Sequence, residues 1–156
     1  MPQELFKLNM ANADLNRNYS SEGGSCTISK KVQYVLQQAD YVYDGHEGYN
    51  FTQLIPSSMG SGVYPSKDKI AIHLATKLVD SINQSPYLRD KEDYKKFITR
   101  KNWDLIDGSL RKFCQQLGIP YILVETTGQN NIQPISVRAD QHYYLCKEMA
   151  QLVGIL

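Results

Sequence analysis

Three short segments of this 156-residue sequence carry side chains that could do chemistry together. Asn16 and Arg17 lie in NADLNRNY, His46 follows the run DYVYDG, and Glu125 follows the apolar run IPYILV. A guanidinium group suits bidentate recognition of a carboxylate, a neutral imidazole is a common metal ligand, and a glutamate can act as a general base. Taken singly, each residue also has a plainer explanation, as a turn with a surface ion pair, a hydrogen-bonded structural histidine or a helix cap.

The sequence around His46 and Glu125 predicts strands that end near these residues. IPYILVETTGQ is an apolar run with β-branched and aromatic residues, which is typical of a buried strand. DYVYDGH predicts a shorter strand that ends at His46, and the Gly- and Ser-rich loop after it predicts another near SGVY. His46 and Glu125 would then lie at the carboxyl ends of two strands, where open α/β sheets usually place their sites.

Amphipathic patterns predict helices around these strands. In ISKKVQYVLQQA, one face carries Ile28, Val32, Val35 and Leu36. In KDKIAIHLATKLVDSIN, one face carries Ile70, Leu74, Leu78 and Ile82. Two further helices are predicted for NWDLIDGSLRKFCQQLG, where Gly118 provides the stop signal, and for SVRADQHYYLCKEMAQLVGIL. The alternation predicts the α/β class, with a mixed, mostly parallel sheet flanked by helices in a single domain over residues 1–156.

The composition argues against a polyanionic or membrane partner. The formal net charge is +1, from 17 basic and 16 acidic residues, so no global electrostatic attraction toward nucleic acid or anionic lipid is expected. The densest basic segment, residues 88–101, interleaves its cations with acidic residues at helical spacing and is interpreted as a solvated helix face. No stretch approaches the length of a membrane span.

The three cysteines are far apart and form no CxxC pair, which argues against a disulfide framework and suits a reducing compartment. Cys114 and Cys146 lie in apolar helical patterns and are expected to be buried. The first residues lack a basic start followed by an apolar run, so a cytoplasmic protein is expected.

NADLNRNY, YDGHEG and YILVETTGQ, in this order, resemble the second, third and fourth signature segments of the zinc carboxypeptidase superfamily, which includes succinylglutamate desuccinylase and aspartoacylase. The resemblance runs from about Leu8 to the last helix. The segments PSSMGSGVYP and VRAD are similar to the desuccinylase and aspartoacylase branch, while LNRNY and ETTG fit the carboxypeptidases equally well. The resemblance implies a zinc carboxypeptidase-like sandwich.

The resemblance also implies roles for individual residues. His46 would be a protein ligand of a catalytic zinc, with Asp44 as the acceptor that fixes its ring. The family usually has Leu where this sequence has Gly45. Glu125 would be the general base that takes a proton from water and returns it to the leaving amine.

Anion recognition is implied for the arginines. Arg17, helped by Asn16, would bind the substrate carboxylate, and Arg138 in VRAD is a second candidate for anions. Arg17, His46, Glu125 and Arg138 are therefore expected to converge on one cleft. The loop after His46 would line the substrate pocket with Tyr49, Met59 and Tyr64.

The sequence departs from the family at its first motif, a His and a Glu that supply the other two zinc ligands. Only MPQELFKLNMANA precedes Asp14, and it contains no His and one Glu, Glu4. His73 and His142 lack the expected spacing and are interpreted as structural or surface residues. The chain is therefore expected to be the N-terminally truncated part of a longer or split hydrolase, a homologue that binds without turnover, or a chain completed by another one. Association with itself or with the missing N-terminal segment is expected.

Two functions stay open on the sequence. The first is a zinc-dependent amide hydrolase, of the carboxypeptidase or N-acyl amino acid deacylase type, that acts on a small carboxylate-bearing substrate or a peptide C-terminus. The alternative is a non-catalytic carboxylate-binding or interaction module of the same fold. A serine or cysteine hydrolase is disfavoured, because there is no Gly-x-Ser-x-Gly elbow and Cys26 has no matched base.

Overall fold

The structure is a computed structural model that describes residues 14–19, 26–101, 106–129 and 132–156. A short 3-10 turn and a helix come before the first strand, and one helix follows the last strand. In chain order the elements are η1 (Leu15–Arg17), α2 (Thr27–Leu36), β1 (Val42–Gly48), β2 (Gly62–Pro65), α3 (Lys69–Gln84), η2 (Asp93–Lys95), β3 (Ile98–Thr99), α4 (Leu110–Leu117), β4 (Tyr121–Thr127) and α5 (Ile135–Leu152).

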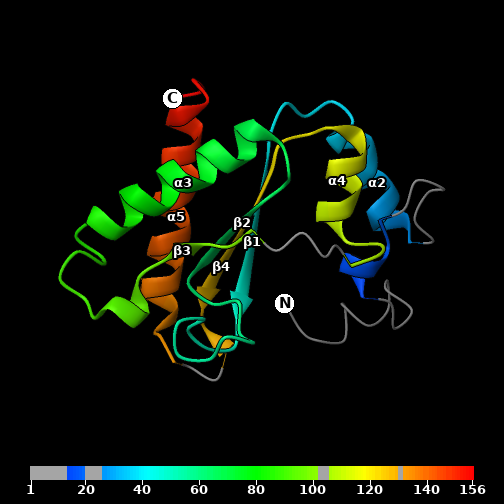
Figure 1. Ribbon diagram of the computed structural model, residues 1–156. Helices are drawn as coiled ribbons and strands as arrows, with labels where there is room; N and C mark the ends of the chain where they lie inside the picture. The colour runs from blue at the N-terminus through cyan, green and yellow to red at the C-terminus, as the bar shows by residue number, and fades with distance from the viewer. Residues whose placement is uncertain (1–13, 20–25, 102–105, 130–131) are drawn as a thin grey trace.

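The four strands form one sheet in the order β1-β4-β2-β3. β1 is parallel to β4 and β2 is parallel to β3, whereas β2 and β4 are antiparallel. Helices α3 and α5 cover one face of the sheet, and α2 and α4 lie on the other side (Figure 1). The predicted mixed, mostly parallel sheet flanked by helices is therefore confirmed.

The central strand β4 is buried along its whole length, as its apolar run predicts. Because side chains alternate along a strand, β4 contributes to two cores. Ile122 and Val124 pack in the cluster that includes α3 and α5. Tyr121 and Leu123 pack in the cluster that includes residues of α2 and α4. Burial of each apolar side chain of this size stabilises the folded state by roughly 1.5–3 kcal/mol. Because β4 contributes such side chains to both cores, it joins the two halves of the fold.

Local signals set the helix ends. The Asp68 carboxylate accepts a hydrogen bond from the Ala71 backbone N–H and caps α3, and Ser109 does the same for Lys112 at the start of α4. Gly118 ends α4 in the left-handed region, with φ of 70°, as predicted; a residue with a Cβ would be strained there. The predicted helix over 102–118 is shorter in the structure, because α4 begins at Leu110; residues 102–105 lie outside the described ranges. Over the described residues, no helix combines the length and apolar character needed to cross a membrane.

The prediction of a helix face over residues 88–101 is wrong. This segment contains turns, the 3-10 turn η2 and the strand β3. Leu88 and Phe97 are buried in the α3–α5 core, and the Asn83 side chain bonds both the N–H and the C=O of Phe97. Burial of these two apolar side chains competes with the helical charge spacing and determines the path of the chain. The charges still pair locally, as Lys95 with Glu92 and Lys96 with Asp93.

The predicted apolar face of α2 and the burial of Cys146 are also wrong in part. Ser29, Gln33 and Leu36 are the buried residues of α2, whereas Ile28 and Val35 are exposed. Cys114 is buried as expected, but Cys146 is exposed on α5. The strand at His46 continues to Gly48, beyond the predicted end.

Helix α3 allows a direct test of which apolar residues hold the core. Leu78 is completely buried, whereas Ile70, predicted on the same face, is 52% exposed. Leu78→Ala should lower the free energy of unfolding by about 2–5 kcal/mol, because it leaves a cavity between α3 and the sheet. Ile70→Ala is the matched control and should change it by about 0.5 kcal/mol or less. Urea titration followed by circular dichroism measures both, and equal losses would contradict this core.

Candidate functional site

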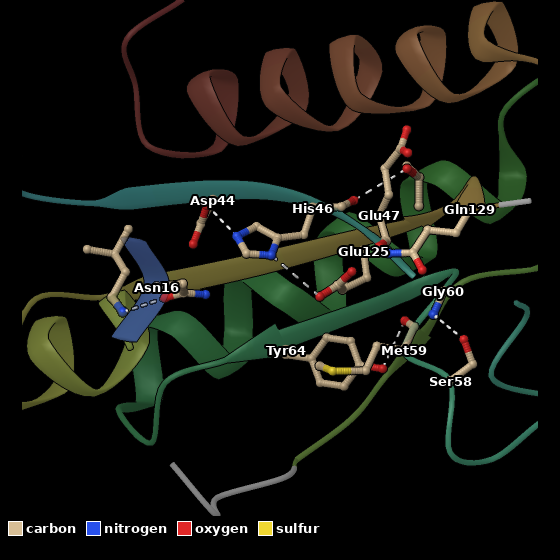
Figure 2. Close-up of polar contacts among 12 residues, drawn as sticks. Asn16, Asp44, His46, Glu47, Ser58, Met59, Gly60, Tyr64, Glu125 and Gln129 are labelled. Atoms are coloured by element: carbon tan, nitrogen blue, oxygen red, sulfur yellow. Dashed lines mark hydrogen bonds and ion pairs between the residues drawn. The ribbon is translucent and has the colours of Figure 1, made fainter. Parts of the chain in front are cut away.

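The pairing of β1 with β4 brings two of the predicted site residues together. His46 lies directly opposite Glu125 in the parallel register. Both side chains face the α2 and α4 side of the sheet, and His46 Nδ1 is 3.8 Å from Glu125 Oε1. Figure 2 shows the ring of His46 between the carboxylates of Asp44 and Glu125.

A cavity of about 230 Å³ opens in front of this pair. Its walls come from η1, β1, the loop before β2, α4 and β4. The residues that line it are Asn16, Arg17, His46, Met59, Ile106, Ser109, Arg111, Tyr121, Leu123 and Glu125. The predicted residues Asn16, Arg17, His46 and Glu125 therefore share one cavity.

Two hydrogen bonds hold the 3-10 turn η1 and the residues after it against the start of α4. Asn16 Oδ1 accepts a hydrogen bond of 2.9 Å from the Leu110 N–H, and the Tyr19 N–H donates to the Gly108 carbonyl at 2.8 Å. Gly108 has φ of +73°, and a Cβ there would collide with the Arg17 backbone. Gly108 thus allows the close approach that places Arg17 at the cavity. The side-chain oxygen of Asn16 is occupied by its hydrogen bond from the first turn of α4. The side-chain N–H₂ of Asn16 is therefore the group that remains for a ligand.

Asp44 orients the His46 ring. His46 Nε2 lies 3.2 Å from Asp44 Oδ1, and the Tyr121 hydroxyl donates to Asp44 Oδ2 at 2.6 Å. Burial alone would raise the pKa of Asp44, but the hydrogen bonds from His46 and Tyr121 lower it. The hydrogen bond to Asp44 raises the pKa of His46, against the effect of burial. With the Nε2 proton held by Asp44, the Nδ1 side of the ring is presented to Glu125 and the cavity.

Glu125 is a buried carboxylic acid of the site, with 6% of its surface exposed. Burial raises the pKa of Glu125 to about 7; the positive charge of His46 opposes this effect and the negative charge of Asp44 adds to it. A carboxyl group with a pKa near neutrality can both accept and return a proton. A role of Glu125 as a general base therefore stays a prediction that is compatible with this pKa.

The cavity contains a second arginine that the sequence analysis did not identify. Arg17 is partly exposed, and its Nη1 donates to the Asn16 carbonyl at 2.7 Å. Arg111 is buried in the cavity wall and donates from Nη2 to the Pro65 carbonyl at 2.8 Å; burial lowers its pKa. One feature of the sequence could have identified Arg111: it lies one helical turn before Cys114 and therefore on the buried face of α4.

Arg138 does not line this cavity, so the expectation that it converges there with Arg17, His46 and Glu125 is wrong. It lies on α5, against the opposite face of the sheet, where Nη1 contacts Glu47 Oε1. Glu47 follows His46 on β1, and consecutive side chains of a strand point to opposite faces. The alternation of β1 therefore separates Arg138 from His46.

The loop between β1 and β2 contributes Met59 to the cavity, as predicted. Tyr64 is buried behind it and donates from its hydroxyl to the Met59 carbonyl at 2.9 Å. Tyr49 instead bonds Ser57 within the loop. Arg100 holds this loop by donating to Thr52 Oγ1 at 2.7 Å and to the Pro56 carbonyl at 3.0 Å. Of the three predicted loop residues, Met59 is thus the one at the cavity wall.

His142 has a structural role, as predicted. Its Nε2 lies 3.2 Å from the His46 carbonyl, and its Nδ1 lies 3.0 Å from the Tyr43 hydroxyl. A Cβ at Gly45 would lie 3.1 Å from His142 Cε1, so a larger side chain at this position would require the His142 ring to shift. His73 is exposed on α3.

The donors in the described residues do not fit a zinc ion by themselves. His46 presents one ring nitrogen to the cavity, and a catalytic zinc usually has about three protein ligands. In the ranges 14–19, 26–101, 106–129 and 132–156, no group of three His, Cys, Asp or Glu residues could hold a metal ion. Zinc therefore stays a prediction from the family resemblance.

No protein-family model and no curated protein sequence matches the chain. Solved structures do match its fold. The mDAP-bound form of Csd4, a D,L-carboxypeptidase from Helicobacter pylori, aligns with a TM-score of 0.76 at 12% identity over 92% of this chain and 39% of Csd4. A candidate metallopeptidase from Shewanella denitrificans aligns with a TM-score of 0.62 at 15% identity over 94% of this chain and 54% of that protein. The chain thus has a metallopeptidase-like fold and spans about 40% to 55% of the length of these neighbours.

The link between Asp44 and His46 predicts a measurable change in titration. Asp44→Asn removes the carboxylate that raises the pKa of His46, so the pKa of His46 should fall. Tyr121→Phe is the matched control, because it removes the hydroxyl that bonds Asp44 and leaves the carboxylate in place. NMR titration of the His46 ring measures the pKa in each variant. An unchanged pKa in Asp44→Asn would contradict the proposed orientation of the ring.

Proposed function

We propose that this chain provides the base and the carboxylate-binding residues of a peptidase-type amide hydrolase. The observation that carries the proposal is the buried Glu125, whose pKa is raised to about 7, opposite His46 in a cavity that also contains Arg17. The substrate would present an amide bond to Glu125 and a free carboxylate to Arg17. A peptide C-terminus and an N-acyl amino acid both meet this description.

Carboxylate recognition is assigned to η1. The partly exposed guanidinium of Arg17 would bind the carboxylate at the cavity mouth, together with the Asn16 side-chain N–H₂. Arg111 adds a second guanidinium in the wall of the same cavity. These cations favour an anionic substrate over a neutral or cationic one, and both arginines contribute to that selection.

Glu125 would act on water. His46 Nδ1 and Glu125 Oε1 are 3.8 Å apart, which is too long for a direct hydrogen bond but leaves both atoms able to bind a bridging water. The ionised Glu125 would take a proton from this water as it attacks the amide carbonyl. The protonated acid would then return the proton to the leaving amine.

The fold of the neighbours supports the peptidase type. Csd4 is a D,L-carboxypeptidase whose structures include mDAP-bound and tripeptide-bound forms. The proposed substrate shares the free carboxylate of such ligands. Zinc belongs to the proposal as an ion for which His46 would be one ligand, with the other ligands coming from outside the described residues. Association with another chain or segment would supply them.

A second candidate is a carboxylate-binding module without turnover. It is favoured by the composition of the site, because the described ranges contain no group of three His, Cys, Asp or Glu residues that could hold a metal ion. In this function Arg17 and Asn16 would still bind a carboxylate, but Glu125 and His46 would catalyse no hydrolysis. Binding and hydrolysis assays on the same variants distinguish the two candidates.

Glu125→Gln tests the catalytic proposal. It should lower kcat/KM for a panel of N-acyl amino acids and short peptides by about 100- to 10,000-fold, because the amide cannot accept the proton from water. Asp140→Asn is the matched control, since Asp140 is exposed on α5 and does not line the cavity; it should leave kcat/KM unchanged. Release of free amine measures hydrolysis.

Arg17→Met tests carboxylate recognition on the same panel, with Arg89→Met as the exposed control. The expected result is weaker binding of carboxylate-bearing peptides in Arg17→Met alone, measured by calorimetry.

Hydrolysis that survives in Glu125→Gln would contradict the catalytic role of Glu125. Arg17-dependent binding with no hydrolysis by the parent chain would favour the second candidate, and neither binding nor hydrolysis would contradict both.

A further inference from the structure

A second cavity of about 250 Å³ lies between the segment around η2 and the first turns of α5. It shares no lining residue with the cavity that contains His46. We propose that this second cavity binds a small apolar carboxylate that carries a hydroxyl or amino group next to its carboxylate. The proposal is independent of the function assigned to Glu125.

Apolar side chains form most of the wall of the second cavity. Phe51 and Leu88 are buried, and Val137 of α5 lies across from them. Tyr87 completes this wall and packs edge-on against Tyr144, with ring centroids 5.8 Å apart. Such a wall suits an aromatic or branched apolar group. The volume lies below the range of roughly 300–1,000 Å³ that is typical for drug-sized ligands, so a smaller ligand is expected.

The inner wall carries a buried polar group that its neighbours do not satisfy. Gln141 has no exposed surface, and its Oε1 accepts no hydrogen bond within the described part of the chain. Its Nε2 has a long contact of 3.4 Å with Gln133 Oε1. Gln133 itself is fixed, because its Nε2 donates to the Thr127 carbonyl at 2.9 Å. Buried acceptors are normally satisfied, so a ligand hydroxyl or amine that donates to Gln141 would supply the missing partner.

Two lysines provide the positive charge at the outer part of the cavity. Lys95 already pairs with Glu92 at 3.0 Å. Lys91 is exposed and lines the cavity; its charge acts on Glu92, but within the described residues it forms no direct ion pair. A ligand carboxylate would therefore bind Lys91, with its neighbouring donor directed inward to Gln141 and its apolar group against Phe51 and Leu88.

Phenyllactate is a suitable probe, because it combines an aromatic group, a carboxylate and an adjacent hydroxyl. We expect saturable binding to the full chain, with NMR shifts at the amides of Leu88, Lys91 and Val137. Phenylpropionate, which lacks the hydroxyl, and 1-phenyl-2-propanol, which keeps the hydroxyl but lacks the carboxylate, should each bind about tenfold more weakly.

Lys91→Gln should weaken phenyllactate binding by about five- to tenfold, since it removes the charged partner at an exposed position where folding is not at risk. Lys96→Gln is the matched control, because Lys96 pairs with Asp93 and does not line the cavity. Gln141→Leu should remove the preference for phenyllactate over phenylpropionate. If Gln141→Leu does not fold, the comparison of the two ligands on the parent chain decides the role of the hydroxyl.

Arg17→Met distinguishes the two cavities. Phenyllactate binding that persists in Arg17→Met and weakens in Lys91→Gln supports the second site, whatever the outcome for hydrolysis. The proposal is overturned if phenyllactate shows no saturable binding, or if its binding is lost in Arg17→Met and unchanged in Lys91→Gln.

Discussion

The parallel register between β1 and β4 is the constraint on which the site depends. It places His46 opposite Glu125 and Asp44 opposite Leu123. Because side chains alternate with a period of two, a slip of one residue would turn Asp44 and His46 toward α5 and away from the cavity. Contacts on the far face fix the same register: His142 meets the space left by Gly45, and Arg138 contacts Glu47. The structural residues of one face thus position the polar residues of the other.

The second constraint is electrostatic. Burial in β4 raises the pKa of Glu125 to about 7. The pKa of Asp44, on the neighbouring strand, is instead lowered, because His46 and Tyr121 both donate hydrogen bonds to its carboxylate. Two carboxyl groups in one site therefore have different protonation behaviour. One orients an imidazole and the other is able to exchange a proton near pH 7. The arginines lie on separate elements, so their role in binding an anion is separate from the chemistry of this pair.

Sequence reasoning identified the parts of the fold that local patterns determine. The apolar run of β4, the stripe of Leu74, Leu78 and Ile82, and the stop at Gly118 are properties of single segments. It failed where distant contacts decide the outcome. Leu88 and Phe97 are buried in a core that also includes residues as distant along the chain as Val63 and Leu145, so the charge spacing of their segment was misleading. Arg111 could not be assigned to the cavity without the packing of α4 on β4, and Arg138 could not be excluded from it without knowing which face β1 presents to α5.

The most direct test of the site is the pKa of Glu125, measured by NMR titration of its side-chain carboxyl carbon in the chain dialysed against a chelator. Glu125→Gln identifies the signal. We predict an apparent pKa of about 7, because burial disfavours the ionised form. A pKa at the ordinary value of 4.5 would mean that Glu125 is solvated and fully ionised at neutral pH. That result would contradict the assignment of Glu125 as the buried general base.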